Sequence, residues 1–466
     1  MRAWPPDLRP LLSPRSIAVV GASAQPNKLG GMPIRLLREN GYAGAVHPVH
    51  RTADEIQGLR AYPSLEAIGA PVDLAVVAVP AGECEGVMEQ MARCGTRAAV
   101  MFTSGFAEVS EEGAQLQRRL GDIARESGIA LLGPNCLGAM NLHDRMFATF
   151  SPVVLGGAPP AGPVALVSQS GAFGGYAFSL ARQAGVGIGH WITTGNEAGV
   201  QVADAIAWLA TDPACERILA YLEGARDLES LRRALLAART AGKPVTIAKV
   251  GHTAAGTRAA KLHTASDTGD PAEYRRLFDA CGVRTARTIA ELFSGPAEEE
   301  APLAANGAPI AILSISGGVG IMMADRAEEL GLTLPPLPDD AAARLKAAIP
   351  FASTHNPIDV TGQVFSQPAV LVQALRDAAL CGRYRHVVAF LAAAGNAPGV
   401  WPMLRDCIAD LRATPGAAPL VLSGLLSGEQ RLWLEQNGCA VLAEPAHAIQ
   451  AAAANHGAST GQIHPR

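Results

Sequence analysis

The sequence has few charged residues, few aromatic residues and no paired cysteines. Charged residues make up 17% of its 466 residues, and the net charge of −4 includes no long run of one sign, so we expect no nucleic-acid partner. The eight cysteines form no C-x-x-C pair, which predicts neither disulfides nor a metal site and indicates a cytoplasmic protein. The apolar runs are short, and the first 16 residues contain no apolar segment, so we expect neither a membrane span nor a signal peptide.

Hydrophobic residues are abundant, at 49%, and they occur as short runs separated by segments of helical periodicity. In the first part of the chain the runs cover residues 16–20, 45–49, 73–79, 97–102 and 129–132, and the helical segments cover residues 33–40, 83–94 and 113–126. Continuous apolar strands that alternate with helices predict an α/β fold with a parallel sheet covered on both faces. Such sheets bind ligands at the carboxyl ends of their strands.

The first strand ends in Gly21, Ala22 and Ser23, which predicts a tight turn able to present backbone N–H groups to a phosphate. The turn lacks the G-x-G-x-x-G pattern of dinucleotide sites. The second strand ends near Arg51, where an NAD site would carry an acidic residue. A basic residue there suits a ligand with an extra phosphate, such as NADP or coenzyme A, although an ordinary solvated arginine is the alternative.

A second strand–turn–helix unit begins at residue 163. The predicted strand at residues 163–167 runs into Ser168, Gln169, Ser170 and Gly171, and a helix follows from about residue 172. This arrangement directs helix N-terminal amides at one point and favours an anion, although a plain N-capped helix would have the same pattern. Glu223 directly follows another strand, at residues 217–222, and could orient an imidazole.

A third unit repeats this pattern after a predicted linker at residues 294–308. A strand at residues 309–315 leads into Ser316, Gly317 and Gly318, and a helix is expected at residues 319–330. Further strands are expected at residues 386–390 and 419–422, residues 356–359 are expected to form a turn, and the tail from residue 454 is expected to be frayed. The two Ser/Gly turns therefore predict related units in separate domains.

One histidine lies in a segment of unusual composition. His263 follows a predicted strand at residues 244–250 within a Gly-, Ala- and Thr-rich stretch that we expect to be a loop, and a helix is predicted from Pro271. Taken alone, such a histidine is more often an ordinary surface or core residue than a catalytic one.

These motifs, in their order along the chain, resemble those of the NDP-forming acyl-CoA synthetases, the superfamily of succinyl-CoA synthetase and ADP-forming acetate-CoA ligase. The resemblance is to the α-type subunit and covers nearly the whole chain. The stretches that carry it are residues 21–23, 71–76, 133–138, 167–172, 194–196, 221–224, 256–260 with 263–264, 316–320 and 356–359.

The resemblance implies a Rossmann-like CoA-binding domain at residues 1–143 and a flavodoxin-like domain at residues 144–295 that carries the phosphohistidine loop. A second flavodoxin-like domain would follow at residues 308–466. His263 matches the family's phosphohistidine, and Glu223 matches the carboxylate that orients it. The implied phosphate-binding residues are Ser168, Gln169, Ser170, Gly171, Ser316, Gly317 and Gly318. The implied CoA-binding residues are Gly21, Ala22, Ser23, Arg51, Val79, Pro80, Asn135 and Cys136, and Cys136 is expected to pack near the thiol without acting as a nucleophile.

The implied reaction interconverts acyl-CoA, ADP and phosphate with a carboxylic acid, ATP and CoA through an acyl phosphate and a phosphohistidine. The chain shows neither a P-loop nor the sequence of an ATP-grasp domain, so we expect ATP or ADP and Mg²⁺ to be bound by a separate ATP-grasp β-type subunit in an α₂β₂ assembly. A small carboxylic acid is the expected substrate.

The chain departs from the family pattern beside the histidine, where Leu262 and Ala265 replace the usual Ser and Gly, and at Glu197 near the expected acyl pocket. Two alternatives stand beside the ligase. Leu262 and Ala265 motivate a catalytically inactive regulatory protein that binds CoA or acyl-CoA, and the fold expected of the first domain alone motivates an NAD(P)-linked Rossmann oxidoreductase.

Overall fold

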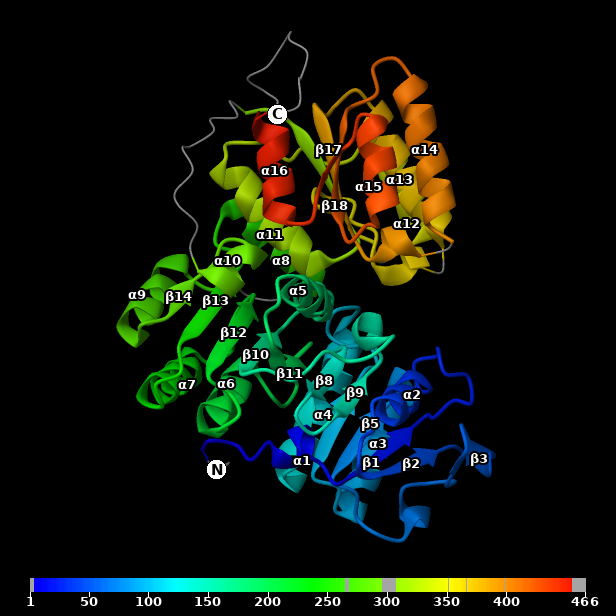
Figure 1. Cartoon of the computed structure of the whole chain (residues 1–466), viewed down its shortest axis with the longest axis vertical. Coiled ribbons are helices and arrows are strands. Elements are labelled where there is room, and N and C mark those ends of the chain that lie inside the picture. Colours follow the sequence, from blue (N-terminus) through cyan, green and yellow to red (C-terminus); the bar gives the residue numbers. More distant parts are fainter. Residues whose placement is uncertain are drawn as a thin grey trace. The chain divides into compact units, whose positions relative to one another are not determined.

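The structure is a computed structural model that describes residues 4–264, 268–295, 307–350, 352–365, 367–397 and 399–454, and only the backbone of Thr264. It forms two compact units, which are described separately. Unit 1 comprises Met1–Ala248 and Ala272–Thr285, and unit 2 comprises Lys249–Pro271 and Ala286–Arg466. Three α/β sheets of five or seven strands, distinguished by colour in Figure 1, confirm the predicted fold class.

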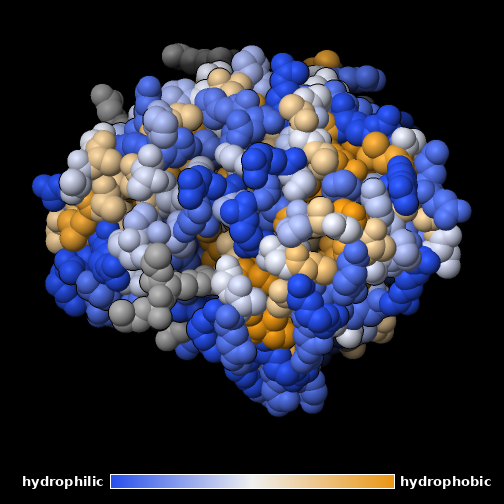
Figure 2. All heavy atoms as spheres, turned by 90° about the horizontal axis from the view of Figure 1, so that it is seen from below, coloured by the Kyte–Doolittle hydropathy of each residue, from blue (hydrophilic) through white to orange (hydrophobic). Residues whose placement is uncertain are grey.

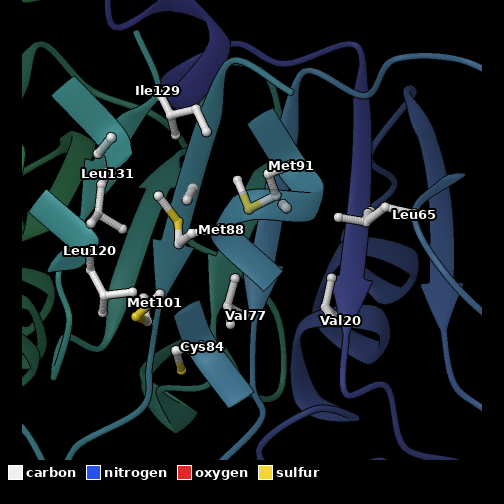
Figure 3. Packing of buried hydrophobic residues seen from close by; sticks show 14 of the residues in the cluster. Val20, Leu65, Val77, Cys84, Met88, Met91, Met101, Leu120, Ile129 and Leu131 are labelled. Atoms are coloured by element: carbon white, nitrogen blue, oxygen red, sulfur yellow. The ribbon is translucent and has the colours of Figure 1, made fainter. Parts of the chain in front are cut away.

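The first sheet of unit 1 is fully parallel, with the order β2-β1-β5-β6-β7. Its strands are β1 (Ser16–Val20), β2 (Ala45–Val49), β5 (Leu74–Val77), β6 (Ala98–Met101) and β7 (Ala130–Leu132). Every residue of β5, β6 and β7 is buried, as expected for a sheet covered on both faces. Figure 3 shows how side chains from these strands pack with Cys84, Met88 and Met91 of helix α3 (Ala81–Cys94) in one hydrophobic cluster.

The second sheet of unit 1 has the order β14-β13-β12-β10-β11-β8-β9. Its strands are β8 (Gly138–Asn141), β9 (Met146–Thr149), β10 (Val164–Ser168), β11 (Ile188–Thr193), β12 (Arg217–Leu222), β13 (Val245–Lys249) and β14 (Arg284–Thr285). β8 and β9 add to the edge as antiparallel strands. The predicted domain boundary at residue 143 falls between these two strands.

The sheet of unit 2 is fully parallel, with the order β16-β15-β17-β18-β19. Its strands are β15 (Ile310–Ser314), β16 (Ile358–Asp359), β17 (His386–Ala392), β18 (Leu420–Gly424) and β19 (Ala440–Leu442). The stretch at residues 356–359, predicted as a turn, thus ends in a short edge strand.

Helices connect and cover the strands. Those of unit 1 are α1 (Arg9–Leu12), α2 (Met32–Glu39), α3, α4 (Glu111–Ser127), α5 (Gly171–Gln183), α6 (Val202–Thr211), α7 (Leu228–Thr240) and α9 (Pro271–Cys281). Those of unit 2 are α8 (Ala254–Thr264), α10 (Ile289–Ser294), α11 (Gly317–Glu329), α12 (Asp339–Ala348), α13 (Pro368–Leu380), α14 (Trp401–Ala413), α15 (Gly428–Gln436) and α16 (Pro445–Ala454). A small β3–β4 hairpin (Glu55–Ile56 and Leu59–Arg60) completes the described strands.

When the parallel strands of each sheet are numbered along the chain, all three sheets have the strand order 2-1-3-4-5, which is typical of doubly wound folds. The order reverses next to β1, β10 and β15, and ligands bind at such switch points beyond the carboxyl ends of the strands. The predicted ligand-binding turns at Gly21, Ser168 and Ser316 lie there, at or directly after the ends of these three strands.

The expectation of a loop around His263 is wrong in one respect, because this residue lies in the last turn of helix α8. The segment holds four alanines, an arginine, a lysine and a leucine, all strong helix formers, against a single glycine. Ala265, most of the predicted linker at residues 294–308 and the tail from residue 455 lie outside the described residues.

On the face shown in Figure 2, hydrophilic residues cover most of the surface and hydrophobic residues lie between them. Among the residues that the structure describes, none of the helices combines the length and the apolar character needed to cross a bilayer.

Candidate active site

His263 lies against the N-terminus of helix α11 in unit 2. A Cβ atom built on Gly317 would lie 2.1 Å from Nδ1 of His263, so the imidazole occupies the space that any side chain at this position would need. The same Nδ1 lies 3.4 Å from Oδ2 of Asp359, at the end of β16. The His263 side chain is 33% exposed and the Asp359 side chain 13%. The structure therefore brings His263 together with the predicted phosphate turn of Ser316, Gly317 and Gly318.

This turn has the geometry of a capped helix start. Ser316 is the N-cap of α11, and its hydroxyl accepts a hydrogen bond from the N–H of Val319. The hydroxyl of Ser314 donates to the carbonyl of Ser316 at 2.6 Å and accepts from its N–H at 3.0 Å. These bonds fix the first turn of α11, where helix amides favour negative charge.

The opposite end of α8 is fixed by acidic residues from the other end of α11, so the two helices run antiparallel, side by side (Figure 1). Asp325 is buried and accepts hydrogen bonds from the N–H groups of Gly251 and Thr253 and from the Thr253 hydroxyl. His252 lies between Asp325 and Glu329, with nitrogen–oxygen distances of 3.2 and 2.8 Å. These contacts satisfy N–H groups at the start of α8 and hold the helix to α11.

In unit 1 the turn of Ser168, Gln169, Ser170 and Gly171 repeats the turn of unit 2. The Ser168 hydroxyl donates to the carbonyl of Ser170 at 2.6 Å, and the Ser170 hydroxyl accepts from the N–H of Phe173 as the N-cap of α5. The two turns are thus the same local structure at the same place in two sheets, as the repeated sequence pattern predicted.

The Gln169 side chain connects this turn to Glu223. Its carbonyl oxygen accepts from the N–H groups of Glu223 at 2.6 Å and Gly224 at 3.2 Å, and its amide donates to the Gly224 carbonyl at 2.7 Å. The Glu223 carboxylate is buried and accepts a hydrogen bond from the Tyr221 hydroxyl at 3.3 Å. Gln169 therefore holds the backbone after β12 in place. Glu223 belongs to unit 1, whereas His263 belongs to unit 2.

The predicted CoA residues of the first sheet lie around its switch point. Gly21 has φ of +81°, and its N–H and that of Ala22 point at the Val49 carbonyl at the end of β2. A Cβ on Gly30 would lie 2.0 Å from the Gly21 carbonyl oxygen, so this loop folds closely on itself. Its backbone contacts continue through Ser23, whose N–H donates to the carbonyl of Gly30.

The remaining predicted CoA-binding residues follow the ends of β2, β5 and β7. Val79 and Pro80 follow β5, and Pro80 is the N-cap of α3. Arg51 is mostly exposed and forms an ion pair with Glu83 in the first turn of α3. The Cys136 thiol is fully buried and donates to the Met101 carbonyl, and burial raises its pKa to about 12. The thiol is therefore poorly suited to be a nucleophile, in line with the expected packing role.

Asn135 and Asn196 link the two sheets of unit 1. The Asn135 amide donates to Oδ1 of Asn196 at 3.2 Å, and the Asn196 amide donates in turn to Glu108 and, at 2.9 Å, to Gln117. Both Asn135 and Glu197 have positive φ, at +56° and +55°, a conformation that side chains rarely adopt and that often marks functional loops.

Glu197, which departs from the family pattern, directly follows Asn196 and is buried. Its Oε1 accepts from the Thr194 hydroxyl and from the N–H of Val202 at the start of α6, both at 2.9 Å. Burial raises the pKa of this carboxyl to about 7. The residue is thus a buried helix cap and not a surface charge.

Comparison with known proteins shows the family to which this chain belongs. A family model for a CoA binding domain matches residues 15–141, and one for a succinyl-CoA ligase-like flavodoxin domain matches residues 161–297. The chain is 32% identical over 458 residues to the alpha subunit of ADP-forming acetate–CoA ligase I of Pyrococcus furiosus, a match that covers 96% of this chain and 97% of the relative. The chain belongs to the NDP-forming acyl-CoA synthetase superfamily.

Two further members of the superfamily extend the comparison. The chain is 36% identical over 359 residues to ADP-forming acetate–CoA ligase I of Archaeoglobus fulgidus, a match that covers 77% of this chain and spans about half (51%) of that relative. A solved structure of a dinucleotide-forming acetyl-coenzyme A synthetase 1 of Ca. Korarchaeum cryptofilum, in complex with phosphate and ADP, has a TM-score of 0.56 and 29% identity, with 96% of each chain covered. This membership favours the ligase prediction over the oxidoreductase and the inactive regulatory protein.

The sequence alone assigns no role to three residues that surround His263 and its helix. Asp359 stands out there only as part of the stretch at residues 356–359, which is a predicted turn and one of those that carry the family resemblance, and Asp325 and His252 do not stand out at all. One signal was available for Asp325, because it is a lone acidic residue after the apolar run Ile321, Met322, Met323 and Ala324 in α11. A buried charge in such a run needs a partner from elsewhere in the chain.

Proposed function

We propose that this chain is the α-type subunit of an ADP-forming acyl-CoA synthetase, which interconverts acyl-CoA, ADP and phosphate with a carboxylic acid, ATP and CoA. Membership of the superfamily supports the reaction class. The observation that carries the proposal is the position of the His263 imidazole. The ring lies against Gly317 at the N-terminus of α11, and the Asp359 carboxylate lies beside its Nδ1.

His263 is the proposed phosphoryl carrier. Phosphate attacks the thioester to give an acyl phosphate and CoA, and a neutral imidazole nitrogen then attacks the phosphorus and releases the carboxylic acid. In unit 2, the capped turn at Ser316 offers amides to the phosphoryl oxygens. In unit 1, the capped turn at Ser170 has the same geometry. The family resemblance implies that Glu223, a residue of unit 1, orients the imidazole of His263.

CoA is proposed to bind at the switch point of the first sheet. The Gly21 loop lies directly after the end of β1, and Arg51 supplies a positive charge near the end of the second strand. Asn135 follows β7 of the same sheet, and it contacts Asn196 of the second sheet. A ligand at this edge would therefore be close to the predicted phosphate turn of Ser168, Gln169, Ser170 and Gly171 within unit 1.

The nucleotide part of the reaction is proposed to need a partner. ATP or ADP and Mg²⁺ would be bound by an ATP-grasp β-type subunit in an α₂β₂ assembly in the cytoplasm, and a small carboxylic acid is the proposed substrate. The relatives named above as acetate–CoA ligases support a small acid.

The acyl-phosphate half of the reaction can be tested on the full chain alone. Purified protein is incubated with [³²P]acetyl phosphate, and protein-bound label that is acid-labile and base-stable is counted. We expect label on wild type and none on His263→Ala, while both bind CoA equally in calorimetry. Label that persists on His263→Ala, or a wild type that takes up no label from acetyl, propionyl or butyryl phosphate, would contradict the proposal.

A further inference from the structure

Asp359 is held rigidly at the edge of the unit 2 sheet. Its N–H and its carbonyl exchange two hydrogen bonds of 3.0 Å with Ser353, and β16 pairs it with Ser314 of β15, two residues before the N-cap of α11. Its Oδ1 accepts a hydrogen bond of 2.8 Å from the N–H of Thr361. One carboxylate oxygen is thus engaged by the backbone, and the other, Oδ2, faces His263.

The imidazole of His263 is located by contacts at both ends of its helix. At the near end, the ring lies over Gly317, with Nδ1 at 3.4 Å from Asp359. At the far end, Asp325 occupies the space beside Gly256, where a Cβ would lie 2.0 Å from its Oδ1. Because a rigid helix connects the two ends, docking at Asp325 sets where His263 meets Asp359.

We propose that Asp359 is a positioning residue that holds Nδ1–H of His263, so that the lone pair of Nε2 receives the phosphoryl group. This inference rests on the function proposed above. As the bond between Nε2 and phosphorus forms, the bond between phosphorus and the acyl oxygen breaks, and its electrons leave with the carboxylate. The ring then carries positive charge with its proton on Nδ1, and the Asp359 carboxylate stabilises that charge.

The orienting carboxylate expected from the family resemblance was Glu223 in unit 1. Asp359 is a second carboxylate for the same imidazole, and it lies in the unit that carries the histidine. The phosphoryl carrier therefore has an orienting group of its own within unit 2, together with the helix start at Gly317.

The substitution Asp359→Asn gives a sharp test, because the Thr361 N–H fixes how the amide must point. Its oxygen stays with that N–H, and its NH₂ group then faces Nδ1 of His263. An amide donor at that position favours the tautomer with the proton on Nε2, which removes the nucleophilic lone pair. The side chain keeps its size, so the fold should be retained.

The experiment combines two readouts on the full chain. In ¹⁵N-histidine spectra, with the His263 signal identified by its loss in His263→Gln, we expect the proton on Nδ1 in wild type and on Nε2 in Asp359→Asn. Labelling by [³²P]acetyl phosphate should fall on the order of ten- to hundredfold, the range typical when the group behind a functional imidazole is removed. Asp359→Glu should restore part of it, and Asp406→Asn on the exposed face of α14 should change neither readout.

The outcomes separate this inference from the proposed function. An unchanged tautomer together with labelling within twofold of wild type in Asp359→Asn would overturn the positioning role. If wild type takes up no label but its tautomer still depends on Asp359, the phosphoryl-carrier function is wrong while the orientation of His263 by Asp359 stands. If Asp359→Asn fails to fold, Asp359→Glu provides the test instead. Labelling of Asp359→Glu at the wild-type level, together with a His263 tautomer different from that of wild type, would also contradict the positioning role of Asp359.

Discussion

Nδ1 of His252 lies 3.2 Å from Oδ2 of the buried carboxylate of Asp325, at the start of the helix that carries His263. Burial by itself would lower the pKa of His252, but hydrogen bonds to Asp325 and Glu329 outweigh it and raise this pKa to about 10. At neutral pH the ring is therefore an imidazolium between two carboxylates. This ion-pair cluster docks α8 on α11, far from the reacting atoms.

Asp325→Asn should release the start of α8. The substitution removes the negative charge and places an amide donor among the N–H groups of Gly251 and Thr253. Loss of one partner from a buried ion pair costs about 3 kcal/mol. We expect hydrogen exchange of the amides at residues 254–264 to accelerate roughly a hundredfold, and His263 labelling to fall with it.

The matched control is Glu435→Gln on α15, whose exposed carboxylate lies 3.9 Å from Arg431. Such a surface pair contributes little, so exchange in α8 should not change. Equal exchange in α8 for Asp325→Asn and wild type would show that the cluster does not hold the helix.

The same cluster predicts a pH dependence in the alkaline range. A histidine whose pKa is raised in the folded state contributes stability that is complete below its unfolded-state pKa and is lost as pH rises through its folded-state pKa. For His252 these pKa values are 6.5 and about 10. The groups that face the ring are Asp325, Glu329 and the Lys249 carbonyl. Exchange of the α8 amides should therefore accelerate between pH 7 and 10 beyond the intrinsic rate. In His252→Gln this extra acceleration should be absent, and its persistence would assign it to another group.

Much of the fold could be predicted because the strands are continuous apolar runs. The strand predicted at residues 309–315 became β15 (Ile310–Ser314), and the helix predicted at 113–126 became α4 (Glu111–Ser127). Both signals are local, since burial on two faces demands apolar residues throughout and a helix shows its period. The antiparallel strands β8 and β9 were missed because such short strands have no comparably long apolar signal.

The site was predicted in part, for the same reason. The two Ser/Gly turns have local sequence patterns, and His263 stood out through its family motif. His252, Asp325 and Asp359 were not assigned, because their roles come from contacts between distant parts of the chain: His252 to Asp325 spans 73 residues and His263 to Asp359 spans 96. The helix at residues 254–264 was also missed, since its small-residue composition suggested a loop while docking on α11 stabilises it.

Gly317→Ala should displace the imidazole of His263. The new Cβ would lie 2.1 Å from Nδ1 and 2.2 Å from Cε1, so the ring must move away from its seat on α11. A displacement of about 1 Å at a reacting group can cost about a hundredfold in rate. We expect labelling by acetyl phosphate to fall by roughly that factor, while CoA binding in unit 1 stays unchanged.

Gly428→Ala is the matched control for this variant. Gly428 is likewise the first residue of a helix, α15, after a serine N-cap, but nothing lies within 4 Å of the position that a Cβ would take there. Alanine is the better helix former by up to about 1 kcal/mol, so neither substitution should weaken its helix. Comparable labelling of Gly317→Ala and Gly428→Ala would contradict the placement of the His263 imidazole against Gly317.

Glu197→Gln should change how the stability of unit 1 depends on pH. Burial raises the pKa of Glu197 from its ordinary value of 4.5 to about 7, so the folded state holds this proton more tightly than the unfolded state. Its contribution is therefore complete below about pH 4.5 and is lost as pH rises through 7, at about 1.4 kcal/mol per pH unit.

Glutamine keeps the oxygen that accepts from Thr194 and Val202 and carries no charge. In urea unfolding, the stability of Glu197→Gln relative to wild type should rise between pH 4.5 and 7 and stay level above that. A difference that does not vary with pH would show that Glu197 is ionised in the folded protein throughout this range.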